Sequence, residues 1–247
     1  MIRGNEVRKK LIEGGISFGT WMQIGHPAVA EILAECGYEW IAADCEHSEI
    51  TIEGVAALAR AMYGRNSLPM VRVKENDTLA IRQVLDAGAK GVFVPLINTA
   101  EEARKAVAAT RYPPEGIRGF AYYRANDYGL NFKDYAETSN EETLVIVMIE
   151  TKQAVENIEE IVAVPGIDGI LIGPYDLSGS YGIPGQVDSP VMREAGKKVI
   201  KACIKSSKAA GLHIVNPDKK KIENALSDGF RLIALGMDNV FLMNQAR

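Results

Sequence analysis

The sequence has few cysteines, and none of them has the spacing of a redox or metal motif. Only three occur among the 247 residues, Cys36, Cys45 and Cys203, and no Cys-x-x-Cys pair is present. Isolated cysteines in odd number are typical of proteins that fold in a reducing compartment. The sequence also lacks a run of about 18 apolar residues, the length needed to cross a membrane, and residues 1–6 contain no signal-peptide stretch. We therefore expect a cytoplasmic protein without a membrane segment.

Basic residues are not concentrated anywhere along the chain. The 28 Lys and Arg residues are mixed with 32 Asp and Glu residues, which gives a net charge of −4. Proteins that bind nucleic acids usually carry a basic patch, often with aromatic residues between the positive charges. The one short basic cluster, residues 219–221, lies beside Asp218 and Glu223, as on a solvated helix face. We therefore expect no nucleic-acid partner.

Short apolar runs alternate with longer helical periods along the whole chain, and runs that are apolar on both faces are typical of buried parallel strands. Strands are predicted at Phe18–Ile24, Trp40–Asp44, Pro69–Val73, Gly91–Leu96, Leu144–Ile149, Gly169–Ile172, His213–Asn216 and Leu232–Ala234. Helices are predicted at Pro27–Cys36, Ile52–Tyr63, Thr78–Ala87, Ala100–Thr110, Thr151–Ala163, Val191–Ala210 and Lys219–Ser227. Eight strand–helix units predict a single α/β domain over residues 1–247, a (β/α)8 TIM barrel.

A doubly wound sheet is the competing arrangement. It usually has a glycine-rich nucleotide loop after its first strand, but residues 21–27 contain no Gly-x-Gly-x-x-Gly motif. The longest irregular stretch runs from Tyr112 to about Asn131, and a loop of this length inside a compact domain is more often functional than idle.

Polar residues at the carboxyl ends of barrel strands face the active site. The second predicted strand ends in Asp44 and is followed by His47, the third contains Arg72, the fifth is followed by Glu150, and the sixth is followed closely by Asp176. Glu150 and Asp176 form a natural pair of oxygen ligands for a hard divalent cation. Each carboxylate alone would equally well cap the helix that follows it.

His47 and Arg72 are the candidates for proton transfer and for binding negative charge. His47 lies three residues after Asp44, a spacing that could orient the imidazole and tune its basicity. Arg72 is placed to hold a carboxylate or a developing enolate, and a salt bridge to a neighbouring acid is compatible with that role.

The remaining histidines and one loop are weaker candidates. His213 begins a predicted strand, so we place it far from the catalytic end, whereas His26 follows the first strand and could contact substrate. The loop at residues 178–185 is rich in backbone donors and could close over an anionic group, although a plain turn-rich loop also explains it.

Several motifs in these regions resemble, in order, those of the HpcH/HpaI aldolase family, the metal-dependent class II pyruvate aldolases that act on 4-hydroxy-2-oxo acids. The motifs are Asp44-Cys45-Glu46-His47, Val71-Arg72-Val73, Asp86-Ala87-Gly88, Val94-Pro95, the segment 111–119, Ile149-Glu150 and the segment 173–178. The resemblance implies a TIM barrel of the phosphoenolpyruvate/pyruvate type and a carbon–carbon lyase. Its expected reaction is reversible aldol cleavage to pyruvate and an aldehyde through a metal-bound pyruvate enolate.

The resemblance also implies a role for each site residue. Glu150 and Asp176 would hold a divalent metal, for which Mg, Mn and Co are all suitable. Arg72 would hydrogen-bond the keto oxygen, and His47, oriented by Asp44, would be the base. The substrate carboxylate would lie against a short segment of backbone formed by Gly173, Pro174, Tyr175 and Asp176.

Members of the family tend to exchange their last helix between neighbours, which implies a homo-oligomer, a trimer or a hexamer, with Asp86 near the shared interface. The sequence departs from the family pattern at Met148, where some members carry Gln, and at Tyr175, where a small residue is common. The chain ends at Arg247, so an exchanged C-terminal helix would be short.

Three other functions compete with the aldolase. Oxaloacetate decarboxylation or a citrate-lyase-like cleavage would use the same metal and enolate. A Schiff-base lyase would need a desolvated lysine, and Lys74 is the candidate, but it stands beside Glu75 and Asp77. A binding or scaffold protein would not need His47 and the other polar residues at the same end of the barrel.

Overall fold

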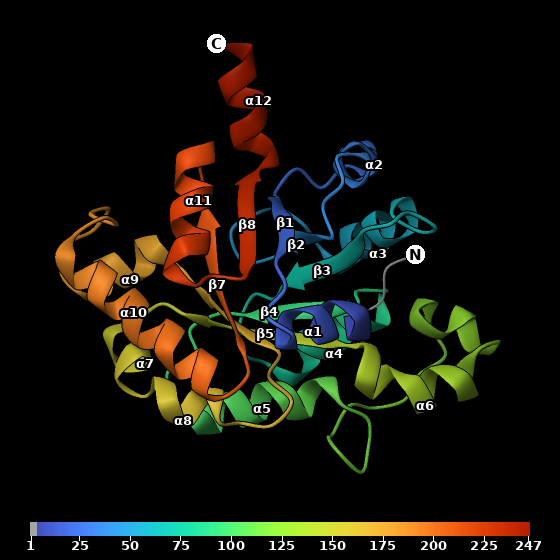
Figure 1. The fold of residues 1–247 in the computed structure, drawn as a ribbon. Helices are drawn as coiled ribbons and strands as arrows, with labels where there is room; N and C mark the ends of the chain where they lie inside the picture. The colour runs from blue at the N-terminus through green and yellow to red at the C-terminus, as the bar shows by residue number, and fades with distance from the viewer. Residues whose placement is uncertain (1–3) are drawn as a thin grey trace.

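The computed structural model describes residues 4–247, and in it eight parallel strands close into a barrel in the order of the sequence (Figure 1). The strands are β1 Ser17–Met22, β2 Trp40–Asp44, β3 Leu68–Arg72, β4 Gly91–Val94, β5 Leu144–Ile149, β6 Gly169–Ile172, β7 Ala209–Ile214 and β8 Leu232–Met237. β8 pairs with β1 and closes the barrel. The predicted (β/α)8 architecture is therefore confirmed. Residues 1–3 of the predicted 1–247 domain lie outside the described residues.

Helices follow the strands and surround the barrel (Figure 1). They are α1 Gly4–Ile12, α2 Pro27–Glu35, α3 Ile52–Ala61, α4 Thr78–Asp86, α5 Ala100–Thr110, the 3₁₀ helix η1 Arg124–Gly129, α6 Phe132–Glu142, α7 Lys152–Glu156, α8 Ile158–Val162, α9 Pro174–Ser180, α10 Pro190–Lys205, α11 Lys219–Asp228 and α12 Asp238–Ala246. Side-chain caps fix the residue at which several of these helices begin. In α5, Thr99 and Glu102 form a capping box.

The helix predicted over Thr151–Ala163 is two short helices, α7 and α8. They meet at Asn157, whose backbone leaves the helical region at φ −92° and ψ 9°. The Asn157 side-chain amide donates to the carbonyl of Asn98 at 2.8 Å, which ties this break to the loop after β4. The backbone hydrogen bonds on either side persist, since Asn157 donates to Gln153 at 3.0 Å and accepts from Ile161 at 3.1 Å, so the break is a local change in backbone angle held by the side chain of Asn157.

The prediction was wrong around β7. The sequence pattern predicted a helix to Ala210 and a strand from His213, whereas α10 ends at Lys205 and β7 begins at Ala209. Ala209-Ala210-Gly211 resembles a helix end with a glycine cap. In the structure Gly211 is a strand residue, and a Cβ there would lie 2.6 Å from the carbonyl oxygen of Ile170 and 2.9 Å from that of Leu232. Close packing against β6 and β8 therefore explains the glycine.

The barrel interior is filled by side chains, with bulky aromatic residues at its centre. Trp21 packs against Phe93 and Trp40, with ring centroids 4.9 and 6.5 Å apart. Val7 and Leu11 of α1 belong to the same buried cluster, so α1 packs against the side chains that fill the barrel. The interior is therefore a packed core over most of its length.

The last helix, α12, leaves the barrel after β8 and extends away from it (Figure 1). Leu242 and Met243 in this helix are 62% and 52% exposed. Within the part of the chain that the structure describes, no helix has both the length and the apolar composition needed to span a membrane. The three cysteines are free thiols.

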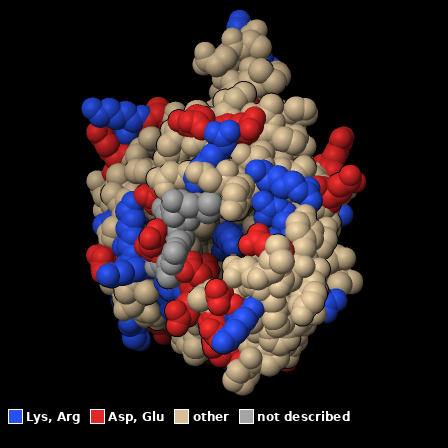
Figure 2. All heavy atoms as spheres, turned by 90° about the vertical axis from the view of Figure 1, so that its right-hand side faces the viewer, with Lys and Arg blue, Asp and Glu red and all other residues tan. Residues whose placement is uncertain are grey.

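Positive and negative side chains are mixed on the face shown in Figure 2, which is the right-hand side of the molecule in Figure 1. Blue and red side chains lie close together across this face instead of forming one large patch of a single sign. Nothing in this view favours a polyanionic partner. The expected absence of a nucleic-acid partner stays a prediction.

Replacing Gly19 in β1 with alanine is expected to destabilise the protein by about 3 kcal/mol, because added bulk in a packed core forces neighbours to shift. A Cβ at this position would lie 2.0 Å from the ring of Trp40, which is fully buried. Chemical denaturation measures the effect. Gly196→Ala in α10 is the control, since the nearest atom would be 3.9 Å away and alanine favours helix. Equal stability of the two variants would contradict the packing argument.

Candidate active site

A pocket of about 260 Å³ opens at the carboxyl ends of the barrel strands. Every residue predicted for the site lines it, so the structure brings together side chains from β2, β3, β5 and β6 and from the start of α9. The lining residues are Trp21, Gln23, Asp44, His47, Arg72, Met148, Glu150, Leu171, Ile172, Gly173, Pro174, Tyr175, Asp176, His213, Val215 and Met237. This is the position of active sites in (β/α)8 enzymes.

Asp44 and Arg72 form a buried, two-pronged ion pair between the ends of β2 and β3. Arg72 Nε donates to Asp44 Oδ1 at 2.8 Å, and Arg72 Nη2 donates to Asp44 Oδ2 at 2.7 Å. Burial alone would raise the pKa of Asp44, but the hydrogen bonds and charge of Arg72 outweigh burial and hold this pKa below its usual value. Conversely, burial would lower the pKa of Arg72, and Asp44 raises it above its usual value. Both groups are therefore charged at neutral pH.

The remaining surface of the Arg72 guanidinium contacts two other residues. Its Cζ lies 4.9 Å from the centre of the Trp21 ring, a cation–π contact. Its Nη1 lies 3.2 Å from Glu46 Oε2. Because Trp21 and Asp44 fix the plane of the guanidinium, this group has a defined direction in the pocket.

His47 lies at the outer edge of the pocket, with 59% of its side chain exposed. Its Nε2 is 3.7 Å from Glu46 Oε2. The contact between His47 and Asp44 differs from the expected one. Asp44 Oδ1 accepts the backbone N–H of His47 at 3.2 Å, and not an N–H of the imidazole ring. Both Asp44 oxygens are already occupied by Arg72. Asp44 therefore fixes the backbone of the loop that carries His47.

Three carboxylates, Glu46, Glu150 and Asp176, lie close enough to interact electrostatically, and Glu150 and Asp176 line the pocket. Glu150 is 3% exposed, and its Oε2 accepts the backbone N–H of Leu96 at 2.8 Å. Burial, with the charges of Glu46 and Asp176, raises the pKa of Glu150 to about 7. Gly173 leaves room for Glu150, since a Cβ there would lie 2.6 Å from Oε1. The mutual repulsion of these groups makes this side of the pocket attractive to a cation.

Within residues 4–247, no three His, Cys, Asp or Glu side chains are arranged to hold an ion together. A metal at Glu150 and Asp176 would therefore take most of its ligands from water and substrate. Mg²⁺ commonly binds in this way, through one or two carboxylates. The oxygen donor set thus fits the predicted metals.

His213 also lines the pocket, which corrects its predicted position far from the catalytic end. Because β7 ends at Ile214, His213 lies near the carboxyl end of that strand. Its Nε2 is 3.2 Å from the carbonyl oxygen of Gly236, and its ring is 5.9 Å from that of Trp21. Burial lowers the pKa of His213 to about 4, so the ring is neutral at pH 7. The sequence predicted a strand here at His213–Asn216, later along the chain than β7, which begins at Ala209.

The comparison with known families decides what kind of protein this pocket belongs to. A family model described as HpcH/HpaI aldolase/citrate lyase matches residues 17–245. The chain belongs to this family. The resemblance predicted from the motifs is confirmed, and the family membership makes the chain a lyase.

Individual relatives cover almost the whole chain. A hydroxypyruvate/pyruvate aldolase of Roseobacter denitrificans is 39% identical over 245 residues, which are 98% of this chain and 94% of the relative. A 4-hydroxy-2-oxovalerate aldolase of Novosphingobium aromaticivorans is 37% identical, over 95% of this chain and 89% of the relative. The crystal structure of an HpcH/HpaI family protein from Burkholderia cenocepacia superposes with a TM-score of 0.93 at 32% identity, covering 98% and 96% of the two chains.

Several motif residues of this HpcH/HpaI chain lie away from the pocket. Asp86 accepts a hydrogen bond at 2.7 Å from Arg118, whose guanidinium lies over the ring of Tyr112 at 4.6 Å. Arg118 is fully buried, so the segment 111–119 contributes a folded loop and no lining residue of the pocket. The predicted functional loop from Tyr112 to Asn131 contains η1 and does not line the pocket.

The alternative candidates also lie outside the pocket lining or have structural partners. Lys74 is exposed and does not line the pocket, which leaves the Schiff-base alternative without a desolvated lysine there. His26 caps α2, since its Nδ1 accepts the N–H of Ala28 at 3.2 Å. In the loop at 178–185, the hydroxyl of Ser178 accepts the N–H of Gly185 at 2.9 Å and so holds the loop folded.

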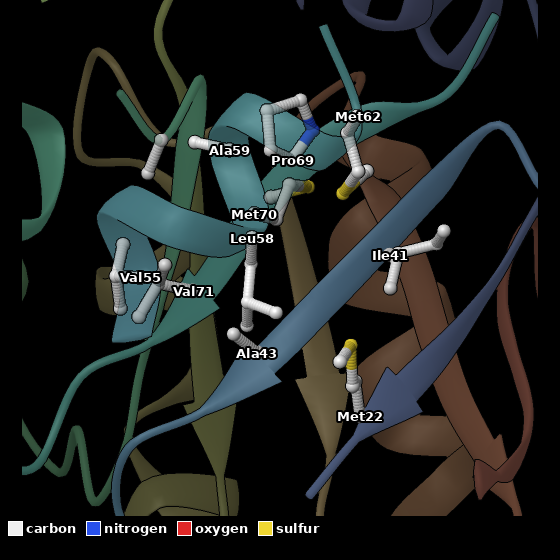
Figure 3. Close-up of a pocket in the computed structure, with 11 residues that line it drawn as sticks. Met22, Ile41, Ala43, Val55, Leu58, Ala59, Met62, Pro69, Met70 and Val71 are labelled. Carbon is white, nitrogen blue, oxygen red and sulfur yellow. The ribbon is translucent and has the colours of Figure 1, made fainter. Parts of the chain in front are cut away.

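A second hollow lies between strands β1–β3 and helix α3 (Figure 3). It measures about 10 Å³ and is lined by apolar side chains such as Met22, Leu58 and Met70. A dry space of this size has room for about one water molecule and no polar partners for it. It is a packing gap and not a catalytic or binding site.

The free energy of unfolding is expected to fall as the pH is lowered from about 6.5 to about 4, because the unfolded chain protonates His213 at about 6.5 and the folded chain only near 4. Protons therefore favour the unfolded state across this range, by at most about 3 kcal/mol. Urea titrations at several pH values measure the effect. The variant His213→Gln should lack this component, and parallel curves for the two proteins would contradict the assignment.

Proposed function

We propose that this chain is a divalent-metal-dependent pyruvate aldolase. It would cleave a 4-hydroxy-2-oxo acid reversibly to pyruvate and an aldehyde, through the enolate of pyruvate. The observation that supports this most strongly is the pairing, in one pocket, of a rigid buried guanidinium at Arg72 with a cluster of carboxylates around Glu150. A 2-oxo acid has a carbonyl oxygen that becomes negative during cleavage, and it needs positive charge on that side.

Glu150 and Asp176 are the proposed metal ligands. Both offer oxygen only, which suits Mg, Mn or Co without choosing among them. When bound, the metal would supply positive charge next to the keto and carboxylate oxygens of the oxo acid and orient them. The raised pKa of Glu150 supports this proposal, since the repulsion among carboxylates that contributes to it is relieved by a cation.

The protein's own residues would bind the substrate and stabilise the developing charge. Arg72 would hold the keto oxygen and stabilise the negative charge that develops there, because its direction is already fixed by Asp44 and Trp21. The substrate carboxylate would lie at Gly173, Pro174, Tyr175 and Asp176. In this segment Pro174 has no N–H and Gly173 donates its N–H to the carbonyl of Ile149, so the backbone donors would be those of Tyr175 and Asp176, at the start of α9.

His47 is the proposed base. In cleavage its Nε2 would take the proton from the C4 hydroxyl, the C3–C4 bond would break, and the electron pair would move to the C2 oxygen as the enolate. A proton returned to C3 then completes pyruvate. The exposure of His47 at the pocket edge supports this role, since the C4 hydroxyl belongs to the aldehyde half, which extends toward the opening.

Oxaloacetate decarboxylation and a citrate-lyase-like cleavage are the second candidates at the same site. Both pass through an enolate, which Arg72 would stabilise equally well, and the family description includes citrate lyase. Oxaloacetate carries a carboxylate in place of the hydroxyl that His47 would deprotonate, whereas a citrate-type substrate keeps a hydroxyl. His47 therefore separates decarboxylation from the two cleavage reactions.

The test is the release of pyruvate from a panel of 4-hydroxy-2-oxo acids by chelator-treated protein, with and without added Mg²⁺ or Mn²⁺. Cleavage is expected only with metal, and His47→Ala should lose at least about 100-fold in kcat, the usual contribution of a positioned base. Oxaloacetate decarboxylation should be much less sensitive to His47→Ala. Metal-independent cleavage would refute the proposal and make Lys74 the next residue to test.

We also propose that residues 1–247 act as one domain and assemble as a homo-oligomer, a trimer or a hexamer. The projecting α12, with Leu242 and Met243 exposed, supports assembly, because an apolar helix face usually packs against a partner. Light scattering measures the state directly. The cytoplasmic location stays a prediction.

A further inference from the structure

Gln23, the first residue after β1, makes three side-chain hydrogen bonds inside the pocket wall. Its Nε2 donates to Asp44 Oδ2 at 2.8 Å and to the carbonyl oxygen of His47 at 3.3 Å. Its Oε1 accepts from Asn239 Nδ2 at 2.6 Å. The orientation of the amide is fixed by this pattern, because a flipped amide would place an oxygen against the Asp44 carboxylate.

The backbone of Gln23 is held by the start of α12. Asp238, which is 5% exposed, accepts the N–H of Gln23 and the N–H of Ile24, both at 2.9 Å. Asp238 also accepts the N–H of Asn239 at 2.8 Å. The first two residues of α12 therefore hold both the main chain and the side chain of Gln23.

Gln23 completes the set of donors around Asp44. Oδ1 of Asp44 accepts Arg72 Nε and the backbone N–H groups of Glu46 and His47. Oδ2 accepts only Arg72 Nη2 and Gln23 Nε2 among the described residues. Without Gln23, Oδ2 would keep a single donor, and the carboxylate could rotate together with the guanidinium that it holds.

We propose that Gln23 is a positioning residue for the Asp44–Arg72 pair, and that through Asn239 it makes the geometry of this pair depend on the seating of α12. The kinetic effects expected from this proposal rest on the proposed function, in which Arg72 stabilises the developing enolate. A connected series of side chains then runs from the projecting helix, through Asn239, Gln23 and Asp44, to Arg72.

The variants Gln23→Met and Asn239→Ala test this chain of contacts. Methionine matches the length of glutamine without its hydrogen bonds, and we expect kcat to fall by about 10- to 100-fold, the usual cost of losing an outer partner. KM for the oxo acid should change little, since the lost alignment matters mainly when charge develops. Asn239→Ala should give a smaller loss of the same kind. The double variant should be no slower than Gln23→Met alone, because both changes remove one series of contacts.

Asn244→Ala is the matched control, since Asn244 lies on the same helix and, among residues 4–247, its side chain bonds only Asn216, at 3.2 Å. It should leave kcat unchanged. Full activity of Gln23→Met, or multiplied losses in the double variant, would overturn the proposal. Thermal unfolding of each variant shows whether a loss reflects only damage to the fold.

A readout independent of turnover separates this proposal from the proposed function. The 1H–15N signal of Arg72 Nε, assigned by its disappearance in Arg72→Lys, should exchange faster with water in Gln23→Met and stay unchanged in Asn244→Ala. Mn²⁺ binding should be equal in wild type and Gln23→Met. If wild type cleaves no oxo acid while the Arg72 signal responds as described, the proposed function fails and the positioning role stands. An unresponsive signal overturns the positioning role.

Discussion

Replacing Arg72 with lysine is expected to lower kcat by about 10²–10³-fold, the usual cost of removing one fixed donor to a developing oxyanion. Arg72 makes two hydrogen bonds to Asp44, approaches Glu46 and stacks on Trp21. A lysine ammonium keeps the charge but cannot occupy all these positions with a fixed plane. Steady-state cleavage of the best oxo acid in the panel measures the effect.

Arg60→Lys is the matched control for Arg72→Lys. Arg60 is exposed on α3, and its guanidinium bonds the hydroxyl of Tyr128 at 3.3 Å, away from the pocket. This variant should keep wild-type activity. If Arg72→Lys kept more than half of kcat, charge alone would be sufficient, and the fixed direction of the guanidinium would have no catalytic role.

Replacing Glu150 with glutamine is expected to abolish tight Mn²⁺ binding and to lower kcat by about 10³-fold or more, since the charge of a bound metal is worth several kcal/mol in the transition state. Glutamine keeps the shape of the side chain, and its oxygen can still accept the N–H of Leu96. The variant should remain folded, because the repulsion from Glu46 and Asp176 that it loses offsets the lost attraction to Arg72. Calorimetric titration with Mn²⁺ and steady-state kinetics measure the two effects.

Glu159→Gln removes the same charge from an exposed position on α8 and serves as the control. It should bind Mn²⁺ as the wild type does. Unchanged Mn²⁺ affinity in Glu150→Gln would place the metal elsewhere, and it would leave Glu150 as a buried carboxylate that only shapes the pocket.

The sequence predicted those parts of the site that directly follow apolar runs. Asp44, Arg72 and Glu150 each end or follow a strand whose bounds were predicted to within one residue. Since all strands of a parallel barrel end at the same side, their convergence followed from the fold class. The repeating local patterns therefore predict both the fold and the end of the barrel at which the site lies.

Contacts between distant residues were not predictable in this way. Gln23 is 21 residues from Asp44 and 216 from Asn239, and no local pattern indicates that they meet. His213 was placed at the wrong end of β7, since small residues that pack closely between strands look like a helix end. The helix α6 was missed because it buries little beyond Ser139 and so shows no clear apolar stripe.

The packed interior beneath the pocket has a kinetic consequence. Trp21, Met148 and Leu171 lie between the pocket and α1 and are at most 3% exposed, so the pocket is closed on that side and opens at the carboxyl ends of the strands. Under the proposed function, the oxo acid would have to reach Glu150, which is deeper than His47 at the edge. In synthesis the oxo acid would then bind before the aldehyde, and in cleavage the aldehyde would leave first. We therefore expect a compulsory-order rate law, in which pyruvate binds the free enzyme and competes with the cleaved acid, whatever the aldehyde.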